Sequence, residues 1–160
     1  MEKRAPYLDT KNLWFKENGR IIKNPPGNLP HDLDIYPRPD YSMEDHHIMY
    51  DGRIQPLTYE IVRQWLEKGT VSSYIKKIGY QTMTGRGCPH KCTYCINDTL
   101  KGMYNNENYL RWRSTAHVID ELLWVKEYLP YIGFIWISDD AFFARNKKSL
   151  EEFCREYKEK

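Results

Sequence analysis

The spacing of apolar and polar residues changes along the chain and divides it into two parts. In the first part, residues 12–23 form two short apolar runs joined by Asn18–Gly19, a pair that readily adopts positive φ and closes a hairpin. Asp51–Gly52 predicts a second hairpin in the same way. Prolines crowd the stretch between these hairpins, so residues 24–45 are expected to form an extended linker.

From Thr58 onward the apolar residues take up helical spacing. A helix over about 59–68 is predicted, with Thr58 as its N-cap and Gly69 in the terminating left-handed position. A strand over 78–84 follows, and then a helix that Ser114 can cap and that ends before Pro130.

The last part of the chain repeats this order. Residues 133–138 form an apolar run rich in β-branched and aromatic residues, which predicts a strand buried on both faces. Asn146 can cap a final helix. Its inner stripe is expected to comprise four apolar positions, namely Leu150, Phe153, Cys154 and Tyr157.

Strands that alternate with helices predict an α/β fold in which βαβ units form a parallel sheet. An eight-unit barrel needs about 250 residues, so two units form only part of one. We therefore expect a partial (βα) TIM-like barrel of about two βα units, preceded by a hairpin and an extended linker. The predicted boundaries are 1–57 for the hairpin and linker and 58–160 for the barrel part, in a truncated piece of a larger protein.

Composition narrows the class of protein. The chain has 160 residues, of which 41% are hydrophobic and 14% aromatic, enough to bury a core. A net charge of +2, from 24 basic and 22 acidic residues, gives no reason to expect nucleic acid or an anionic membrane as a partner. No apolar run reaches the length of a membrane span or a signal peptide, so we expect a cytoplasmic protein.

Three of the four cysteines lie together. Cys88, Cys92 and Cys95 have the spacing C-x3-C-x2-C directly after the strand predicted over 78–84 and a Gly-Arg-Gly turn. Three thiolates on one loop can hold three corners of a cubane iron–sulfur cluster, whose usual complement is four cysteines. One iron would then be open to a small molecule.

Other interpretations of this loop remain. A structural zinc ion prefers four closed ligands, and His90 is the available fourth donor, which makes a small zinc-binding structural or interaction module without catalysis the alternative. A loop that binds no metal is a further alternative. Cys154 lies far from the other cysteines in a helical pattern and is expected to be a buried helix residue.

The stretch Thr84-Gly-Arg-Gly-Cys-Pro-His-Lys-Cys-Thr-Tyr-Cys-Ile-Asn97 closely resembles the signature loop of radical S-adenosylmethionine (SAM) enzymes, in which C-x3-C-x-aromatic-C is characteristic. Two later stretches, 109–122 and 137–157, resemble the cobalamin-binding subclass of that superfamily. Residues 12–40 resemble the hairpin and linker that join the cobalamin domain to the barrel. The resemblance implies a barrel of radical SAM type over 58–160 and the tail of a cobalamin-binding-type domain within 1–57.

This resemblance implies roles for particular residues. Cys88, Cys92 and Cys95 would ligate a [4Fe–4S] cluster whose fourth iron binds the amino and carboxylate groups of SAM. Tyr94 matches the aromatic position near the adenine. Three polar residues at a strand end would contact the methionine part of SAM, although the usual glycine-glycine-glutamate form is absent; they are Ser138, Asp139 and Asp140. The motif D-x-H-x-x-G is also absent, so cobalamin is expected only in a full-length parent.

The implied function is reductive cleavage of SAM to a 5′-deoxyadenosyl radical, in a protein similar to cobalamin-dependent methyltransferases and cyclases. The implied partners are a small-molecule substrate and an electron donor such as flavodoxin or ferredoxin. An RNA substrate, as in methylthiotransferases, is disfavoured by the neutral charge balance.

Overall fold

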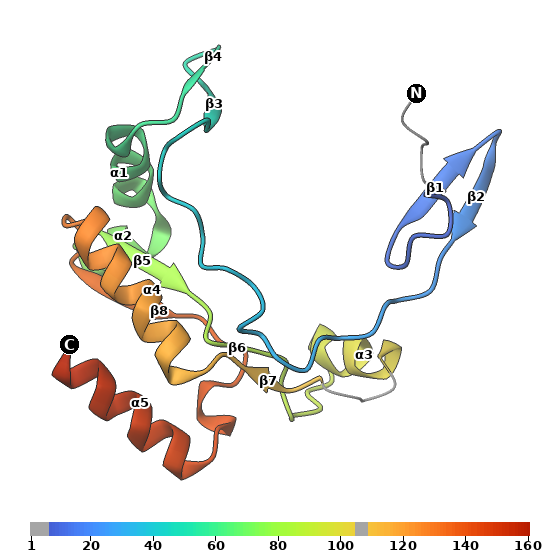
Figure 1. Ribbon diagram of the computed structural model, residues 1–160. Helices are drawn as coiled ribbons and strands as arrows, with labels where there is room; N and C mark the ends of the chain where they lie inside the picture. The colour runs from blue at the N-terminus through green and yellow to red at the C-terminus, as the bar shows by residue number, and fades with distance from the viewer. Residues whose placement is uncertain (1–6, 105–108) are drawn as a thin grey trace. The chain divides into compact units, whose positions relative to one another are not determined.

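The computed structural model describes residues 7–104 and 109–160 (Figure 1). The first six residues of the predicted 1–57 segment therefore lie outside the described residues. The chain divides into two compact units, residues 1–31 with 90–109, and residues 32–89 with 110–160. Each unit is described by itself.

The first unit contains the predicted N-terminal hairpin. Strands β1 (Trp14–Glu17) and β2 (Arg20–Lys23) pair antiparallel, with Trp14 opposite Lys23. Asn18 and Gly19 between them both have positive φ, 49° and 78°, which confirms the hairpin turn. The same unit contains helix α3 (Ile96–Met103), which follows the cysteine loop directly and which the Asn-rich sequence did not predict.

The second unit begins with residues that contain no helix or strand until His47, as expected for the proline-rich linker. Strands β3 (His47–Tyr50) and β4 (Arg53–Pro56) then form the second predicted hairpin. Helix α1 (Tyr59–Lys68) begins as predicted, because the side chain of Thr58 accepts a hydrogen bond from the Ile61 N–H.

Gly69 ends α1 as predicted, but the left-handed conformation predicted for it was wrong. Its backbone is extended, with φ −62° and ψ 145°, because it serves at once as the C-cap of α1 and the N-cap of a further helix, α2 (Thr70–Ile75). The left-handed residue comes later, at Lys76, where α2 ends with φ 61°. A glycine between two consecutive helices is thus used to start the second helix.

A parallel βαβ unit forms the centre of the second unit. Strand β5 (Gly79–Thr82) pairs in parallel with β8 (Phe134–Ile137), and helix α4 (Thr115–Tyr128) is the last element of the connection between them (Figure 1). This confirms the predicted strand–helix–strand order, while the larger barrel stays a prediction. Two caps are confirmed as well: Ser114 accepts from the His117 N–H at 3.1 Å, and Asn146 accepts from the Ser149 N–H at 2.9 Å.

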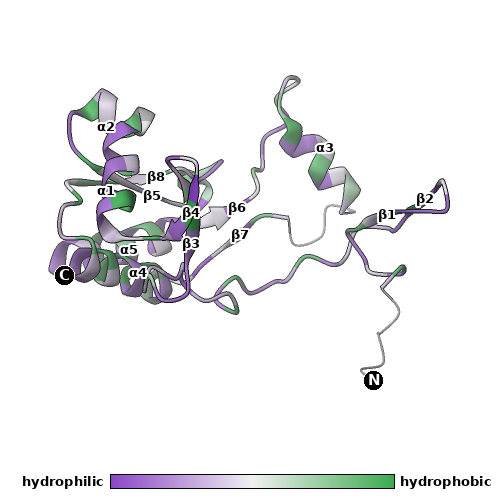
Figure 2. Cartoon of the chain, turned by 90° about the horizontal axis from the view of Figure 1, so that it is seen from above, coloured by the Kyte–Doolittle hydropathy of each residue, from purple (hydrophilic) through white to green (hydrophobic). Residues whose placement is uncertain are grey.

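The core lies between this strand pair and the helices. Helices α4 and α5 (Lys147–Glu159) carry apolar and polar residues side by side (Figure 2), and their apolar residues meet Tyr80 of β5. The buried cluster comprises Tyr80, Val118, Ile119, Leu122, Val125, Leu129 and Phe153. Burial of these side chains holds α4 and α5 against one face of the sheet.

Two burial predictions were wrong. Strand β8 is not buried on both faces, because Trp136 is 42% exposed on the face that the described helices leave open. In α5 only Phe153 of the expected inner stripe is buried, while Cys154 and Tyr157 are exposed. Helix α5 contacts the core along a stripe narrower than four positions, and Cys154, next to Phe153 in sequence, is turned about 100° away from it around the helix axis.

None of the helices within residues 7–104 and 109–160 combines the length and the apolar character that crossing a bilayer demands.

Candidate functional site

The carboxyl ends of β5 and β8 lie at the same edge because the two strands are parallel. Asp139 follows β8 and accepts hydrogen bonds from the backbone N–H groups of Thr84, at 2.6 Å, and Gly85, at 3.1 Å. The Thr84 hydroxyl donates to the other carboxylate oxygen. The Asp139 side chain is only 2% exposed, and Thr84 is fully buried. The carboxylate therefore fixes the backbone from which the cysteine loop departs.

Arg145 balances the charge of this carboxylate. Its guanidinium is buried, donates to the Thr84 carbonyl at 2.8 Å and forms an ion pair with Asp139 at 3.8 Å. It also lies over the ring of Trp112, with 5.7 Å between the guanidinium carbon and the ring centre. Burial lowers the pKa of Arg145 and the charge of Asp139 opposes that shift, so the guanidinium stays charged.

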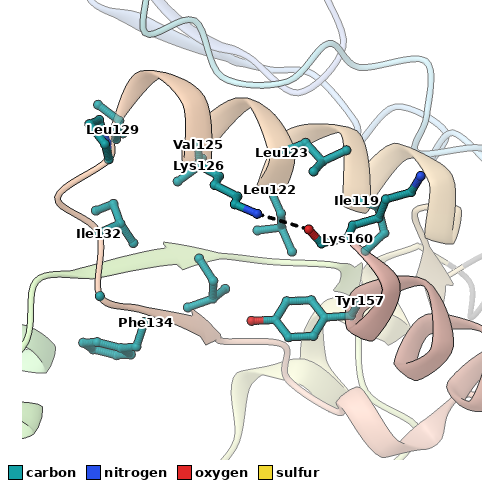
Figure 3. Close-up of a pocket in the computed structure, with 13 residues that line it drawn as sticks. Ile119, Leu122, Leu123, Val125, Lys126, Leu129, Ile132, Phe134, Tyr157 and Lys160 are labelled. Carbon is teal, nitrogen blue, oxygen red and sulfur yellow. Dashed lines mark hydrogen bonds between the residues drawn. The ribbon is translucent and has the colours of Figure 1, made fainter.

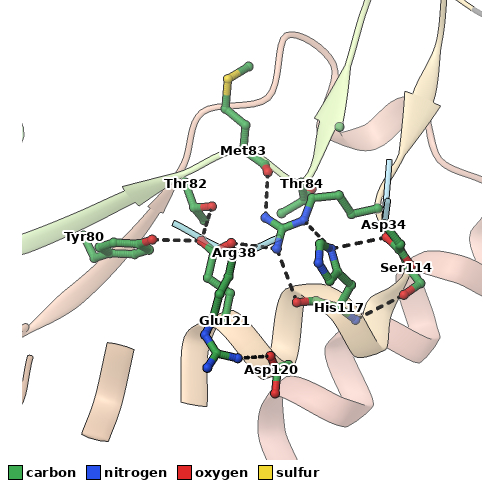
Figure 4. A network of polar contacts seen from close by, with 12 residues as sticks. Asp34, Arg38, Tyr80, Thr82, Met83, Thr84, Ser114, His117, Asp120 and Glu121 are labelled. Carbon is green, nitrogen blue, oxygen red and sulfur yellow. Dashed lines mark hydrogen bonds and ion pairs between the residues drawn. The ribbon is translucent and has the colours of Figure 1, made fainter. Parts of the chain in front are cut away.

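A second buried carboxylate, Glu121, lies on the face of α4 that meets the strands (Figure 4). It accepts hydrogen bonds from the hydroxyls of Tyr80, at 2.9 Å, and Thr82, at 2.7 Å. Arg113 pairs with its other oxygen at 2.6 Å. Burial, together with hydrogen bonds to Tyr41 and Glu121, raises the pKa of Tyr80, so its hydroxyl stays protonated and can donate.

Arg113 connects this second cluster to the first. Its guanidinium donates to the Met83 carbonyl at 3.2 Å, and its own backbone N–H donates to the Thr84 carbonyl at 2.9 Å. The residues just before Gly85 are thus held from three directions, by β8, by α4 and by the segment that precedes α4. Little freedom remains at the base of the cysteine loop.

The linker contributes to the same region. Asp34 accepts from the Ser114 N–H at 2.9 Å at the start of α4. One turn or more further along the helix, Arg38 pairs with Asp120 at 2.8 Å. Burial raises the pKa of Asp34, but hydrogen bonds from Ser114 and the positive charges nearby outweigh burial and hold the pKa below its usual 3.8. The predicted linker therefore lies along α4.

The two residues that follow Thr84 form a short strand pair with the segment before α4. Strand β6 (Gly85–Arg86) pairs antiparallel with β7 (Arg111–Trp112). A side chain at Gly85 would place its Cβ 2.5 Å from the Trp112 ring, so only glycine permits this approach. Gly87 has a φ of 88°, which turns the chain into the cysteine loop as expected.

The structure places the cysteines as follows. Cys88 is buried in the second unit, whereas Cys92 and Cys95 belong to the first unit and are exposed and partly exposed. The Cys95 N–H donates to the Cys92 carbonyl at 3.0 Å, which forms the turn before α3. All four cysteines carry free thiols. Tyr94 is 92% exposed, and so is available to a ligand.

In the described part of the chain, no three His, Cys, Asp or Glu side chains gather around one point as a metal site requires. The ligand set therefore stays a prediction. Its chemistry fits the implied cluster, because three unpaired thiols on one loop are the donors that iron–sulfur clusters use.

The other predicted site residues differ in their surroundings. Ser138 donates through its backbone N–H and its hydroxyl to the Thr82 carbonyl, at 2.9 and 3.2 Å. Both oxygens of Asp139 are engaged by the loop base. Asp140 is exposed. Among these three polar residues, Asp140 is the one turned to solvent.

Sequence reasoning missed Thr84, Glu121 and Arg145. A signal was present for Glu121, because a glutamate spaced with the apolar residues Val118, Leu122 and Val125 falls on the buried face of α4. A buried carboxylate needs partners, which predicts a nearby arginine or several hydroxyls. Arg145 gave no comparable signal, because it lies in an irregular segment.

A hollow in the described residues lies elsewhere. It has a volume of about 330 Å³ and is lined by apolar residues of α4, β8 and the end of α5, including Leu122, Phe134 and Tyr157 (Figure 3). Lys126 reaches across to the Lys160 carbonyl at 3.2 Å. None of the cysteines lines it, so it belongs to the helix-covered core and not to the candidate site.

Comparison with known proteins gives one distant link. The uncharacterized methyltransferase PH0819 of Pyrococcus horikoshii is 27% identical to the chain over 141 residues. The match covers 87% of this chain and 24% of that protein, so the chain spans about a quarter of its relative's length. No protein-family model matches the chain, and no solved structure matches it significantly. The chain is thus distantly similar to a methyltransferase.

Proposed function

We propose that the chain is the cluster-bearing part of a radical SAM enzyme of the methyltransferase-like kind. The observation that carries this proposal is the C-x3-C-x2-C set of free thiols, Cys88, Cys92 and Cys95, directly after a strand end that buried polar groups hold in place. The distant similarity to a methyltransferase supports it, because methyltransferases commonly use SAM. Methyl transfer, a small-molecule substrate, an external electron donor and a cobalamin domain are proposed for the whole protein only.

In this proposal each cysteine ligates one iron of a [4Fe–4S] cluster, and the fourth iron is left for the amino and carboxylate groups of SAM. When bound, the cluster supplies the electron for reductive cleavage of SAM. Tyr94, exposed on the same loop, would contribute to the binding of the adenine. Asp140, exposed beyond β8, would bind the methionine amino group together with Ser138.

Asp139 takes a different role in the proposal. Its carboxylate is buried and occupied by Thr84 and Gly85, so it positions the loop base and reaches SAM only through that backbone. Asp139 and Arg145 form a neutral pair, which keeps an unpaired charge away from the strand end. The position of Cys88, three residues after Gly85, depends on this anchor.

Anaerobic reconstitution with iron and sulfide tests the proposal. The expected result is a brown, oxygen-sensitive protein that contains about four irons and four sulfides per chain. Changing any one of the three loop cysteines to alanine is expected to abolish loading, whereas Cys154→Ala serves as the matched control and keeps it. A colourless protein that contains one zinc ion, and that loses this ion when His90 is replaced by alanine, would instead identify the zinc-binding structural module.

A further inference from the structure

A buried amide lies next to one of the three loop cysteines. Asn97, the second residue of α3, has its side-chain nitrogen 3.5 Å from the Cys95 sulfur. The hydroxyl of Tyr109 donates to the Asn97 side-chain oxygen at 2.7 Å. Asn97 is 9% exposed and Tyr109 is 8% exposed. All three residues belong to the first unit, so their contacts lie within one compact body.

The two contacts determine how the amide is oriented. A side-chain amide has an oxygen that accepts and a nitrogen that donates. Because the oxygen is held by the Tyr109 hydroxyl, the NH2 group is turned toward the Cys95 sulfur. The contact between Asn97 and Tyr109 is buried, which shields it from water and strengthens it, while the contact with Cys95 is partly buried.

The contact distinguishes Cys95 from the other cysteines. Among the hydrogen bonds within residues 7–104 and 109–160, it is the one that ends on a cysteine sulfur. Tyr109 contacts Asn97, and Asn97 contacts the Cys95 sulfur. The hydrogen bond from Tyr109 ties Asn97 to a distant part of the chain and leaves the NH2 group of Asn97 directed at the sulfur.

We propose that Asn97, oriented by Tyr109, donates a hydrogen bond to the Cys95 thiolate that ligates the cluster and thereby raises the reduction potential of that cluster. The proposal rests on the proposed function, in which Cys95 is a ligand. Reduction adds one negative charge to a cluster held by thiolates, and an N–H group directed at a ligand sulfur stabilises the more negative state. Hydrogen bonds to the sulfurs are among the features that set the potentials of iron–sulfur clusters.

The test uses the full chain, reconstituted anaerobically, in four forms: wild type, Asn97→Ala, Tyr109→Phe and Thr99→Ala. Thr99 is an exposed residue of the same helix and serves as the control. Iron and sulfide are counted first, and the midpoint potential is then measured by a redox titration followed by electron paramagnetic resonance. Counting and titration together separate loss of the cluster from a change in its potential.

Iron and sulfide contents are expected to match those of the wild type in every variant. Removing the amide is expected to lower the ratio of reduced to oxidised cluster at a fixed potential by about three- to tenfold, the effect of one modest hydrogen bond. A tenfold change equals about 59 mV for a one-electron couple. Tyr109→Phe is expected to shift the midpoint in the same direction by less, and Thr99→Ala to leave it unchanged.

The outcomes distinguish this inference from the proposed function. A wild-type chain that takes up no iron overturns the proposed function and this inference with it. A loaded wild type whose midpoint equals that of both Asn97→Ala and Tyr109→Phe overturns the inference alone. If Asn97→Ala fails to fold or to bind the cluster, the midpoint potential of Tyr109→Phe decides, since this variant retains the Asn97 amide and every cysteine. A midpoint equal to that of the wild type then overturns the inference.

Discussion

Replacing Glu121 by glutamine is expected to destabilise the protein strongly, although the two side chains have nearly the same shape. Glu121 is 2% exposed and pairs with Arg113 at 2.6 Å, while the Arg113 side chain is 13% exposed. Glutamine leaves no cavity, so the effect comes from charge and hydrogen bonding alone. The buried guanidinium of Arg113 loses its counter-charge, and the hydroxyls of Tyr80 and Thr82 lose a charged acceptor.

The magnitude follows from these contacts. Removing one partner of a buried ion pair costs about 3–5 kcal/mol, because the other charge stays buried and unpaired. Glutamine retains one acceptor oxygen, which places the expected loss at about 3 kcal/mol. With a urea dependence of about 2 kcal/mol per molar, the unfolding midpoint should fall by about 1.5 M.

The assay is equilibrium urea unfolding at neutral pH, followed by far-ultraviolet circular dichroism. Glu127→Gln is the matched control, because Glu127 lies on the same helix and is exposed, and its loss is expected to stay within about 0.5 kcal/mol. If Glu121→Gln is unfolded before urea is added, Thr82→Val, which removes one hydroxyl donor, is expected to lose about 1 kcal/mol. A Glu121→Gln loss no larger than that of the control would refute the reasoning.

Three further predictions concern the loop base, the linker and the fourth cysteine. Asp139→Asn is expected to weaken the hydrogen bonds that hold the Thr84 and Gly85 N–H groups and to speed their hydrogen exchange by about tenfold or more. Asp140→Asn, the control, should leave the exchange rates unchanged. Equal rates in both variants would speak against the anchoring role of Asp139. The pKa of Asp34 is lower in the folded state than in the unfolded state, so the ionised carboxylate stabilises the fold. This stabilisation is present above the pKa of the unfolded state and is lost as the pH falls through the pKa of the folded state. Asp34→Asn should therefore flatten the loss of stability below about pH 4, and an unchanged profile would contradict this. Because Cys154 is exposed, Cys154→Ala should change stability by less than about 0.5 kcal/mol, and a larger loss in urea unfolding would show that the thiol is packed.

The features that could be predicted from the sequence depend on neighbouring residues. The caps Thr58, Ser114 and Asn146 form because each side chain reaches an N–H group three residues on, and the Asn18–Gly19 turn needs only its own positive φ values. The parallel strand pair could also be predicted, since a helix lies between the two apolar runs and leads directly into the second of them.

The features that were missed depend on contacts between residues far apart in the sequence, or on a residue that serves two neighbouring elements at once. The pairing of Gly85–Arg86 with Arg111–Trp112 is two residues long and joins segments far apart in the sequence. Gly69 ends α1 as predicted, but it also starts α2, and its backbone is extended and not left-handed. The role of Asp139 could not be predicted either, because two adjacent carboxylates give no sign of which one turns inward to Thr84.

The most direct test of the candidate site is electron paramagnetic resonance of the reduced, reconstituted chain before and after SAM is added. If Cys88, Cys92 and Cys95 leave one iron open, the signal should shift when the amino and carboxylate groups of SAM bind that iron. An unchanged signal from a fully loaded cluster, or a bound tetrahedral zinc ion in its place, would contradict the assignment.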